Sequence, residues 1–272
     1  MILMKVNLIY FTQTGNTRRI ARAMAEVFRE AGWDTRTISL KKVTVQDAVE
    51  ADLLGVGSPC FSSQAPTPIK SFLSSLPPLA HKKAFVFATS GTAPGRVLYD
   101  LYALLNKKNA DVIGGFLARG MVHHPAPCLY GRLPDRPNDK DFLQARQFAA
   151  ELVRHMNSGF TGKVAGSRAD TFKLRYGFYD FVAFISSDAM LRLLMPKPKL
   201  NMDKCNQCRW CEFECPVHNI ALNPYPTLDT ACIRCYRCVN GCPQKAYSVN
   251  WKLANLVVYA FYNKTFTRWF GT

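Results

Sequence analysis

Eight of the ten cysteines in this chain lie in one short stretch, between Cys205 and Cys242. They form two runs of the same pattern, C-x2-C-x2-C-x3-C-P, which repeat at an offset of 27 residues. The chain has 272 residues, 48% of them apolar, so it can build a hydrophobic core without disulfide staples. Its beginning lacks the charged, apolar and small-residue pattern of a secretion signal, and we therefore expect a reducing, cytoplasmic environment. In that setting the crowded cysteines predict metal ligands.

Within each run, three thiolates at two-residue gaps predict the wrapping of one cubane-shaped iron–sulfur cluster. The fourth ligand of each cluster is expected from the other run, because the remaining cysteine of the same run is out of local reach. The expected ligand sets are Cys205, Cys208, Cys211 and Cys242 for one cluster, and Cys232, Cys235, Cys238 and Cys215 for the other. A pair of zinc sites is the alternative, although zinc ligands usually come as two well-separated pairs.

With these cysteines, residues 197–250 resemble the bacterial-type ferredoxin module that carries two [4Fe–4S] clusters. The resemblance implies a small α+β domain and one-electron transfer at low potential. Three arginines lie inside the runs, at Arg209, Arg234 and Arg237. We expect their positive charge to raise the potential somewhat.

The first half of the chain alternates short apolar runs with amphipathic stretches. The apolar runs predict buried strands over residues 5–11, 35–40, 52–57, 84–89 and 111–117. Helical spacing of apolar residues predicts helices over residues 16–30, 66–76, 96–107 and 141–156. Five strands with intervening helices predict an α/β fold with a doubly wound, five-stranded parallel sheet.

The segment after the first predicted strand is rich in hydroxyl groups and opens the first helix. Its residues are Thr12, Gln13, Thr14, Gly15, Asn16 and Thr17. Backbone N–H groups at a helix start, together with these hydroxyls, predict a site for a phosphate group. The loop lacks the lysine of a P-loop, and the G-x-G-x-x-G fingerprint is absent, so ATP, GTP and a built-in NAD(P) site are disfavoured. A capped strand–helix turn without a ligand is the alternative.

This loop resembles the FMN-phosphate loop of flavodoxins, and residues 4–156 match the length and strand–helix order of that family. The resemblance implies the strand order 2-1-3-4-5, with FMN at the carboxyl ends of the strands. It also implies that the loops after the third and fourth strands hold the isoalloxazine ring. The matching residues are Ser58, Pro59, Cys60 and Phe61 in the first loop, and Ser90, Gly91 and Thr92 in the second. Only Phe61 offers an aromatic ring there, and the loop 118–135, with His123, His124 and Tyr130, is a candidate for a cover.

Taken together, the two halves resemble the flavodoxin–ferredoxin fusion proteins called ferrodoxins. The domain organisation that follows is a flavodoxin-like FMN-binding domain over residues 1–157, a helical interdomain segment over 158–196, a ferredoxin domain over 197–250 and a basic, aromatic tail over 251–272.

The function implied by the resemblance is electron relay between FMN and two [4Fe–4S] clusters, to or from a separate redox partner. No acid–base constellation accompanies the predicted pocket, which favours an electron carrier over a stand-alone enzyme. Two alternatives stay open. One is a flavin-dependent reductase of a small substrate that the clusters feed with electrons. The other is a cluster-only ferredoxin whose flavodoxin-like domain is an empty docking scaffold.

The balance of charge bears on the partner. The chain carries 35 Lys and Arg against 19 Asp and Glu, a formal net charge of +16. This predicts an acidic redox protein as partner, and we expect no nucleic acid. For the tail 251–272 we hypothesise docking to that partner; a membrane-surface contact, or packing across the ferredoxin domain, is the alternative. No apolar run approaches the roughly 20 residues needed to span a bilayer.

Overall fold

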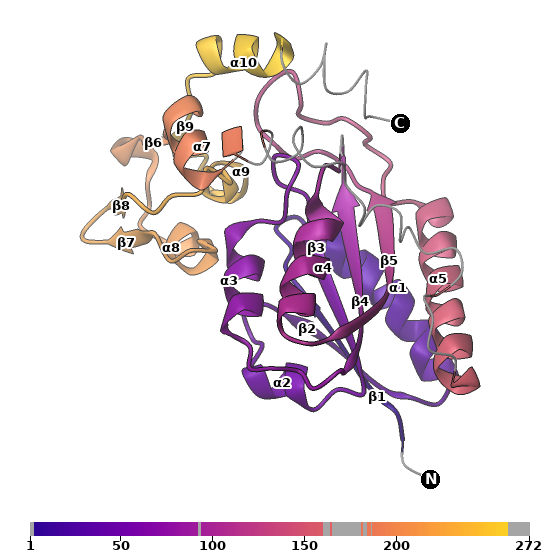
Figure 1. Ribbon diagram of the computed structural model, residues 1–272. Coiled ribbons are helices and arrows are strands. Elements are labelled where there is room, and N and C mark those ends of the chain that lie inside the picture. Colours follow the sequence, from indigo (N-terminus) through magenta and orange to yellow (C-terminus); the bar gives the residue numbers. More distant parts are fainter. Residues whose placement is uncertain are drawn as a thin grey trace. The chain divides into compact units, whose positions relative to one another are not determined.

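The computed structural model describes residues 3–91, 94–159, 164, 181, 184–185 and 187–260 (Figure 1). The chain forms two units. The first comprises Met1–Met121 and Leu133–Tyr179, and the second comprises Val122–Arg132 and Asp180–Thr272. Most of the interdomain segment 158–196, and the tail beyond residue 260, lie outside the described residues. The short segment 122–132 therefore interrupts the first unit in sequence and belongs to the second.

The first unit is built on a five-stranded parallel sheet. Its strands are β1 (Lys5–Tyr10), β2 (Asp34–Ser39), β3 (Leu53–Pro59), β4 (Lys83–Ser90) and β5 (Asp111–Arg119). They lie in the order β2-β1-β3-β4-β5, and every neighbouring pair is parallel. This confirms the predicted sheet and its order. The reversal of winding after β1 leaves the carboxyl ends of β1 and β3 adjacent, which is where such sheets bind ligands.

Helices cover both faces of this sheet (Figure 1). They are α1 (Asn16–Glu30), α2 (Val45–Val49), α3 (Thr67–Ser75), α4 (Val97–Lys107) and α5 (Asp139–Ser158). One face is covered by α1 and α5, and the other by α3 and α4. The four predicted helices agree with the structure to within two residues at each end. The sequence pattern does not predict α2, because a helix of five residues is too short to show a helical period.

Alternate strand residues divide the core into two layers. In β1, Val6 and Leu8 pack under α1 and α5, while Ile9 packs under α3 and α4; all three are fully buried. This is the period of two expected for a strand that is covered on both faces. On the α1 side, Gly57 leaves room for the ring of Phe87, whose Cζ atom lies 2.2 Å from where a Cβ of residue 57 would be.

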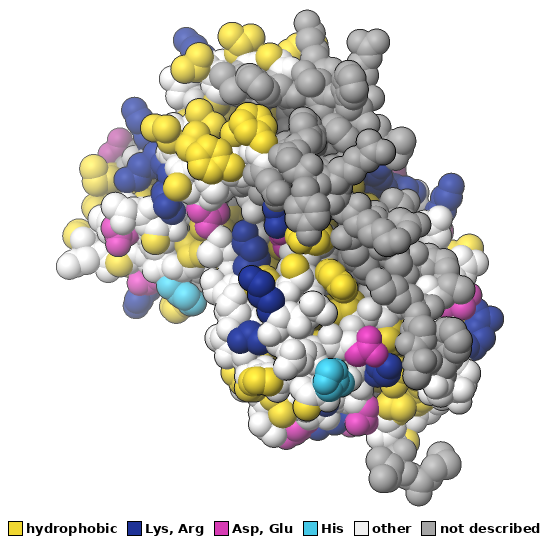
Figure 2. All heavy atoms as spheres, in the orientation of Figure 1, with side chains coloured by type: hydrophobic (Ala, Val, Ile, Leu, Met, Phe, Trp, Pro, Cys, Tyr) yellow, Lys and Arg dark blue, Asp and Glu magenta, His cyan; other side chains and the backbone are white. Residues whose placement is uncertain are grey.

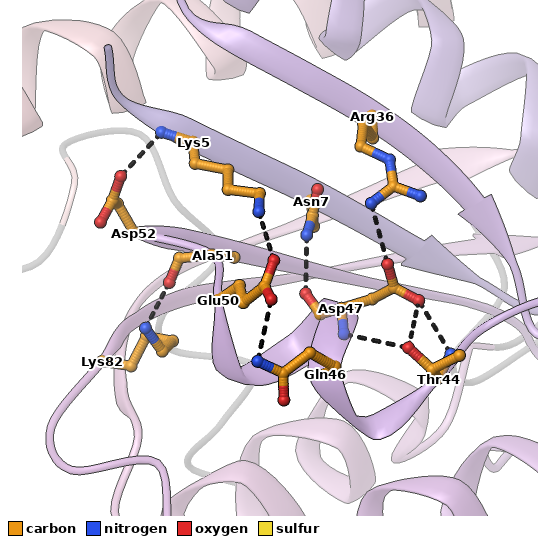
Figure 3. A network of polar contacts seen from close by, with 10 residues as sticks. All are labelled: Lys5, Asn7, Arg36, Thr44, Gln46, Asp47, Glu50, Ala51, Asp52 and Lys82. Carbon is orange, nitrogen blue, oxygen red and sulfur yellow. Dashed lines mark hydrogen bonds and ion pairs between the residues drawn. The ribbon is translucent and has the colours of Figure 1, made fainter. Parts of the chain in front are cut away.

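The amino-terminal edge of the sheet is closed by a polar network around α2 (Figure 3). The helix begins with a capping box in which the amide of Asp47 donates to Thr44 Oγ1 at 3.3 Å and the amide of Thr44 donates to Asp47 Oδ2 at 2.8 Å. Arg36 of β2 donates to the same carboxylate at 2.9 Å. Asn7 of β1 donates from Nδ2 to the Asp47 carbonyl at 2.7 Å. The network therefore ties α2 to the two strands beside it.

In the described residues of the second unit, all helices and strands are short. Its helices are α7 (Asp188–Leu194), α8 (Trp210–Glu214), α9 (Arg237–Gly241) and α10 (Lys252–Val258), with a 3-10 turn at Met202–Lys204. Two antiparallel pairs of strands accompany them: β6 (Lys199–Leu200) with β9 (Tyr247–Ser248), and β7 (Ile220–Leu222) with β8 (Pro226–Leu228). None of the helices in the described part of the chain is long and apolar enough to cross a membrane.

The backbone of the second unit repeats with the cysteine pattern. The helices α8 and α9 are related by the same 27-residue offset as the two runs. Non-glycine residues with positive φ also occur in pairs at this offset. The pairs are Gln207 with Arg234, Arg209 with Tyr236, and His218 with Lys245. Since a positive φ is unfavourable for these residue types, its recurrence shows that both runs are held in the same tight conformation.

We expect the substitution Asp47→Asn to remove part of the acid sensitivity of folding. The hydrogen bonds from Thr44, together with the guanidinium of Arg36, hold the pKa of Asp47 below its ordinary value. A lowered carboxyl pKa adds stability that is present above the unfolded-state pKa of about 3.9 and is lost as the pH falls through the folded-state pKa.

Urea unfolding followed by far-UV circular dichroism measures this effect. At neutral pH the variant is expected to be less stable by about 1 kcal/mol, as for a lost helix cap. The difference in unfolding free energy between the two proteins is expected to shrink as the pH drops below about 4. A difference that stays constant with pH would show that the Asp47 carboxylate is not the group involved.

Candidate functional site

The segment between β1 and α1 forms a tight turn at the carboxyl edge of the sheet. Gly15 has a φ of 95°, in the left-handed region that favours glycine, and its amide donates to Thr12 Oγ1 at 3.1 Å. Helix α1 follows at once, runs for 15 residues and carries no acidic residue in its first turn. The positive end of its dipole therefore faces this turn without a competing carboxylate from the helix itself.

Two side chains of the turn brace it against the sheet. Thr17 is fully buried, and its hydroxyl shares a hydrogen bond of 2.9 Å with the hydroxyl of Thr89 on β4. Asn16 donates from Nδ2 to the carbonyl of Met121 at 3.1 Å. Of the three hydroxyls expected to face a phosphate, that of Thr17 is thus engaged beneath the turn. No local sequence pattern indicates that Thr89 and Met121 support this turn.

The loop after β3 carries Ser58, Pro59 and Cys60 to the same edge of the sheet. Ser58 is fully buried, and its hydroxyl donates to the Pro59 carbonyl at 2.9 Å. The Cys60 amide donates to the Thr89 carbonyl at 2.8 Å, and its thiol donates to the Pro94 carbonyl at 3.3 Å. Desolvation by burial raises the pKa of Cys60 to about 12, so the thiol stays protonated at neutral pH. Cys60 is therefore a lining residue and no nucleophile.

Phe61 begins a tight turn that closes on Gln64 through two backbone hydrogen bonds of 2.9 Å. The ring of Phe61 packs edge-on against Phe11, with centroids 6.1 Å apart and an interplanar angle of 68°. This contact with Phe11, the residue after β1, fixes the orientation of the Phe61 ring. Phe61 is therefore held at the same sheet edge as the turn over residues 12–17.

The loop after β4 contributes Ser90 and Gly91, while Thr92 lies outside the described residues. Ser90 is buried, and its carbonyl accepts from the Gly120 amide at 3.2 Å. Gly95 has a φ of 51°, and a Cβ there would lie 2.1 Å from the Ser63 carbonyl oxygen. Only glycine therefore allows the loops after β3 and β4 to approach this closely.

In the second unit the eight cysteines of the repeat line two cavities. One cavity is lined by Cys205, Cys208, Cys211 and Cys242. A second cavity is lined by Cys215, Cys232, Cys235 and Cys238. The fourth cysteine of each run thus faces the cavity of the other run, and this division is the same as that of the two expected ligand sets.

The cavities also have donors directed at sulfur. The amide of Asn219 donates to Cys215 Sγ at 3.2 Å, and that of Ala246 donates to Cys242 Sγ at 3.3 Å. Tyr247 donates from its hydroxyl to Cys211 Sγ at 3.4 Å. Among the described residues, no group of three or more His, Cys, Asp or Glu is placed to hold a metal ion. Each cavity is lined by four cysteines, the number of ligands that one [4Fe–4S] cluster or one zinc ion takes.

Charges beside the cavities are paired. Arg209 donates to Glu212 at 2.7 Å, next to the first cavity. Arg237, next to the second, donates from Nε to Glu214 at 2.8 Å and lies over the ring of Trp210, with its Cζ atom 5.6 Å from the centroid. Because both arginines have a carboxylate partner, their expected effect on a reduction potential is smaller than the sequence alone suggested.

Of the loop residues predicted as a cover for a flavin ring, His124 is engaged in contacts within the second unit. The ring of His124 lies 5.2 Å from that of Tyr236 and 5.4 Å from that of Trp251. Its Nδ1 accepts from the Ala126 amide at 3.2 Å. Burial lowers the pKa of His124 to about 4, so this imidazole is neutral at physiological pH. The structure therefore gives His124 a packing role.

Comparison with known proteins identifies the first unit. The flavodoxin domain family matches residues 7–155, more than half of the chain. The chain belongs to the flavodoxin domain family. The flavodoxin of Megasphaera elsdenii is 25% identical over 126 residues, which cover 45% of this chain and 92% of that protein. The flavodoxin of Clostridium beijerinckii is 23% identical over 111 residues, which cover 40% and 80%. A solved flavodoxin from the domain Archaea aligns with 57% of this chain and 99% of its own, at 19% identity and a TM-score of 0.46.

The flavodoxin domain match spans the turn at Gly15 and the loops that carry Phe61 and Gly91. It ends before both cysteine runs. The recognised family therefore accounts for the sheet and its carboxyl edge, while the chemistry of the second unit has to be argued from its own residues.

We predict that Gly95→Ala destabilises the flavodoxin domain by about 2–4 kcal/mol. About 1 kcal/mol comes from placing a Cβ in left-handed backbone. Roughly 1–3 kcal/mol more comes from the clash with the Ser63 carbonyl. Gly159→Ala is the matched control, because its φ of 65° is similar and nothing lies within 4 Å of its Cβ position. Urea unfolding separates the two contributions. Equal losses in both variants would contradict a close approach of the loops.

Proposed function

We propose that this protein is an electron-transfer flavoprotein that relays electrons between FMN and two [4Fe–4S] clusters, to or from a separate redox partner. The proposal rests on one juxtaposition within a single chain. A flavodoxin domain is joined to a unit whose eight cysteines divide, four and four, between two cavities. The flavodoxin domain family supports FMN binding and electron transfer. The clusters are our inference from the cysteines.

The residues at the carboxyl edge of the sheet fit an FMN phosphate. The turn over Thr12, Gln13, Thr14 and Gly15 would direct backbone N–H groups to it, with the positive end of α1 behind them. Asn16 and Thr17 would hold the turn in place through their contacts with Met121 and Thr89. Pre-set donors of this kind favour an anion because they need no rearrangement when it binds.

The loops after β3 and β4 would hold the isoalloxazine ring. The residues are Ser58, Pro59, Cys60 and Phe61 in the first loop, and Ser90, Gly91 and Thr92 in the second. Phe61 would offer its ring, since its contact with Phe11 already fixes its orientation. The protonated, half-buried Cys60 would add an uncharged wall.

The two cysteine sets would each bind one cluster. Cys205, Cys208, Cys211 and Cys242 form the first set, and Cys232, Cys235, Cys238 and Cys215 form the second. The paired positive-φ residues keep each run curled, and the amides of Asn219 and Ala246 would stabilise the charge on the cross-run thiolates. FMN exchanges up to two electrons and each cluster exchanges one, so the chain would convert between two-electron and one-electron partners.

The partner is proposed to be an acidic redox protein. The chain has a net charge of +16, and Figure 2 shows Lys and Arg side chains spread over the described part of one face. Opposite charges accelerate encounter, and salt screens them within about 10 Å at 0.1 M ionic strength. Electron transfer to an acidic acceptor is therefore expected to slow by at least about tenfold between low and high salt. Stopped-flow kinetics over a series of salt concentrations measures this, and a rate insensitive to salt would count against an acidic partner.

Metal content tests the cluster assignment directly. The anaerobically purified protein is expected to hold about eight irons and eight acid-labile sulfides, with one extractable FMN. Cys208→Ala and Cys235→Ala each remove one ligand, one from each set, and each is expected to lose about half of the iron. Cys60→Ala is the matched control, because its thiol lies in the flavodoxin domain, and it is expected to keep all the iron. Zinc in place of iron, or no iron loss in either cluster variant, would overturn the proposal.

The same samples separate the alternatives. Clusters without extractable flavin would leave a ferredoxin with an empty flavodoxin domain. Rapid, saturable oxidation by a small molecule, with no partner protein present, would favour a flavin-dependent reductase.

A further inference from the structure

The two cysteine cavities are built alike in most respects. In each, the cysteine from the other run accepts one backbone N–H, at 3.2 Å for Cys215 and 3.3 Å for Cys242. Each cavity also has one arginine beside it whose charge is offset by a glutamate. These pairs are Arg209 with Glu212 and Arg237 with Glu214. Features shared by both cavities cannot give two bound clusters different properties.

One hydrogen bond breaks this equivalence. The hydroxyl of Tyr247 donates to Cys211 Sγ at 3.4 Å, and the contact is buried. At the 27-residue offset, Tyr247 corresponds to Ile220, and Cys211 corresponds to Cys238. Both Tyr247 and Ile220 belong to the small core between the runs, with 7% and 6% of their surface exposed. Isoleucine has no donor, so the second cavity has no counterpart of this bond at that position.

Solvent access also differs between the two runs, and the first run is the more exposed. In the first run, residues 206–209, including Cys208, are exposed. In the second run, the equivalents of Asn206 and Arg209 are Ile233 and Tyr236, which are only 5% and 1% exposed. The Tyr236 hydroxyl donates to the Pro196 carbonyl at 2.9 Å, so its hydrogen bond goes to backbone and not to a thiolate.

Both differences are expected to raise the reduction potential of a cluster in the first cavity above that of a cluster in the second. Adding an electron makes a cluster and its thiolates more negative, which strengthens a hydrogen bond donated to sulfur. Water likewise stabilises the more negative state better than a covered surface does. A neutral phenol has an ordinary pKa near 10, so its hydroxyl remains a donor at neutral pH.

We propose that Tyr247 sets the order of the two potentials, so that the cluster bound by Cys205, Cys208, Cys211 and Cys242 has the higher one. This inference rests on the proposed function, since it needs both clusters. A single electron added to the pair reduces the cluster of the first set, and the cluster of the second set stays oxidised. Tyr247 keeps its proton throughout, and its role is to position a dipole. The exposed run around Cys208 then makes the electron-rich cluster the one accessible to an external partner.

Arg234 is the cation that would act in the opposite direction, since it lies within the second run. Its guanidinium donates to the carbonyls of Arg192 and Met195, at 3.0 and 3.1 Å. It lines a separate concavity with Lys197, next to Asp229. Carbonyl oxygens and this carboxylate partly offset its charge, whereas the Tyr247 hydroxyl contacts a ligand sulfur directly.

Potentiometric titration of the holoprotein, followed by electron paramagnetic resonance, tests this inference. The wild type is expected to show two separate one-electron steps. In Tyr247→Phe the equilibrium constant for moving an electron from the second cluster to the first is expected to fall about tenfold, because only the part of the hydrogen bond that differs between oxidation states is lost. Tenfold corresponds to about 59 mV for a one-electron step. The shift is expected in the higher step alone.

Tyr236→Phe is the matched control. It removes one hydroxyl from another buried tyrosine between cysteines of the second run, but that hydroxyl bonds to a carbonyl. It is expected to leave the higher step unchanged. Iron and sulfide are counted in every sample. Samples with about eight irons in which Tyr247→Phe shifts neither step, shifts the lower one, or shifts both equally would overturn this inference while leaving the proposed function in place. Wild-type protein without iron and sulfide would overturn both.

Discussion

The second unit depends on how its cysteines are held around the two cavities. In the described part of the second unit, the hydrophobic cluster between the runs has three buried members, Cys211, Ile220 and Tyr247, and few other large apolar side chains, such as Ile233 and Tyr236, are buried beside it. Such a small core cannot offset the loss of chain entropy on ordering two runs with repeated left-handed residues. Small domains of this kind generally need metal or disulfides, and metal binding then contributes directly to the folding free energy. Under the proposed function, the groups that carry electrons would also hold this unit together.

In the flavodoxin domain, by contrast, the packing of the sheet positions the loops of the proposed FMN site. Two layers of buried side chains fix the strands, and the parallel order brings every carboxyl end to one edge. Thr89 of β4 contacts both of the loops concerned. Its hydroxyl supports Thr17 in the phosphate turn, while its carbonyl accepts from the amide of Cys60 in the ring loop. A single residue of β4 therefore supports both parts of the proposed FMN site.

Strands, long helices and cysteine sets were accessible from the sequence because each leaves a local pattern. Apolar runs bounded by turns marked all five strands, and a clear helical period marked Asn16–Glu30. The short helix Val45–Val49 left no such pattern and was missed. The packing of His124 against the rings of Tyr236 and Trp251 could not be predicted either, because these residues lie more than 100 positions later in the chain and no local pattern connects them to His124.

What the sequence determined by itself is periodic or closely spaced: the parallel sheet, the glycine-containing turn before the first helix and the two repeated cysteine runs. What only the tertiary structure decided is which distant side chains meet. Thr17 and Thr89 come together because β1 and β4 flank β3 in one sheet. Tyr247 reaches Cys211 because β9 and α8 pack into the same small core. Contacts of this kind depend on the packing of elements far apart in the chain, and no local pattern records them. For that reason the sequence made the two cysteine runs look equivalent, while the fold makes them different.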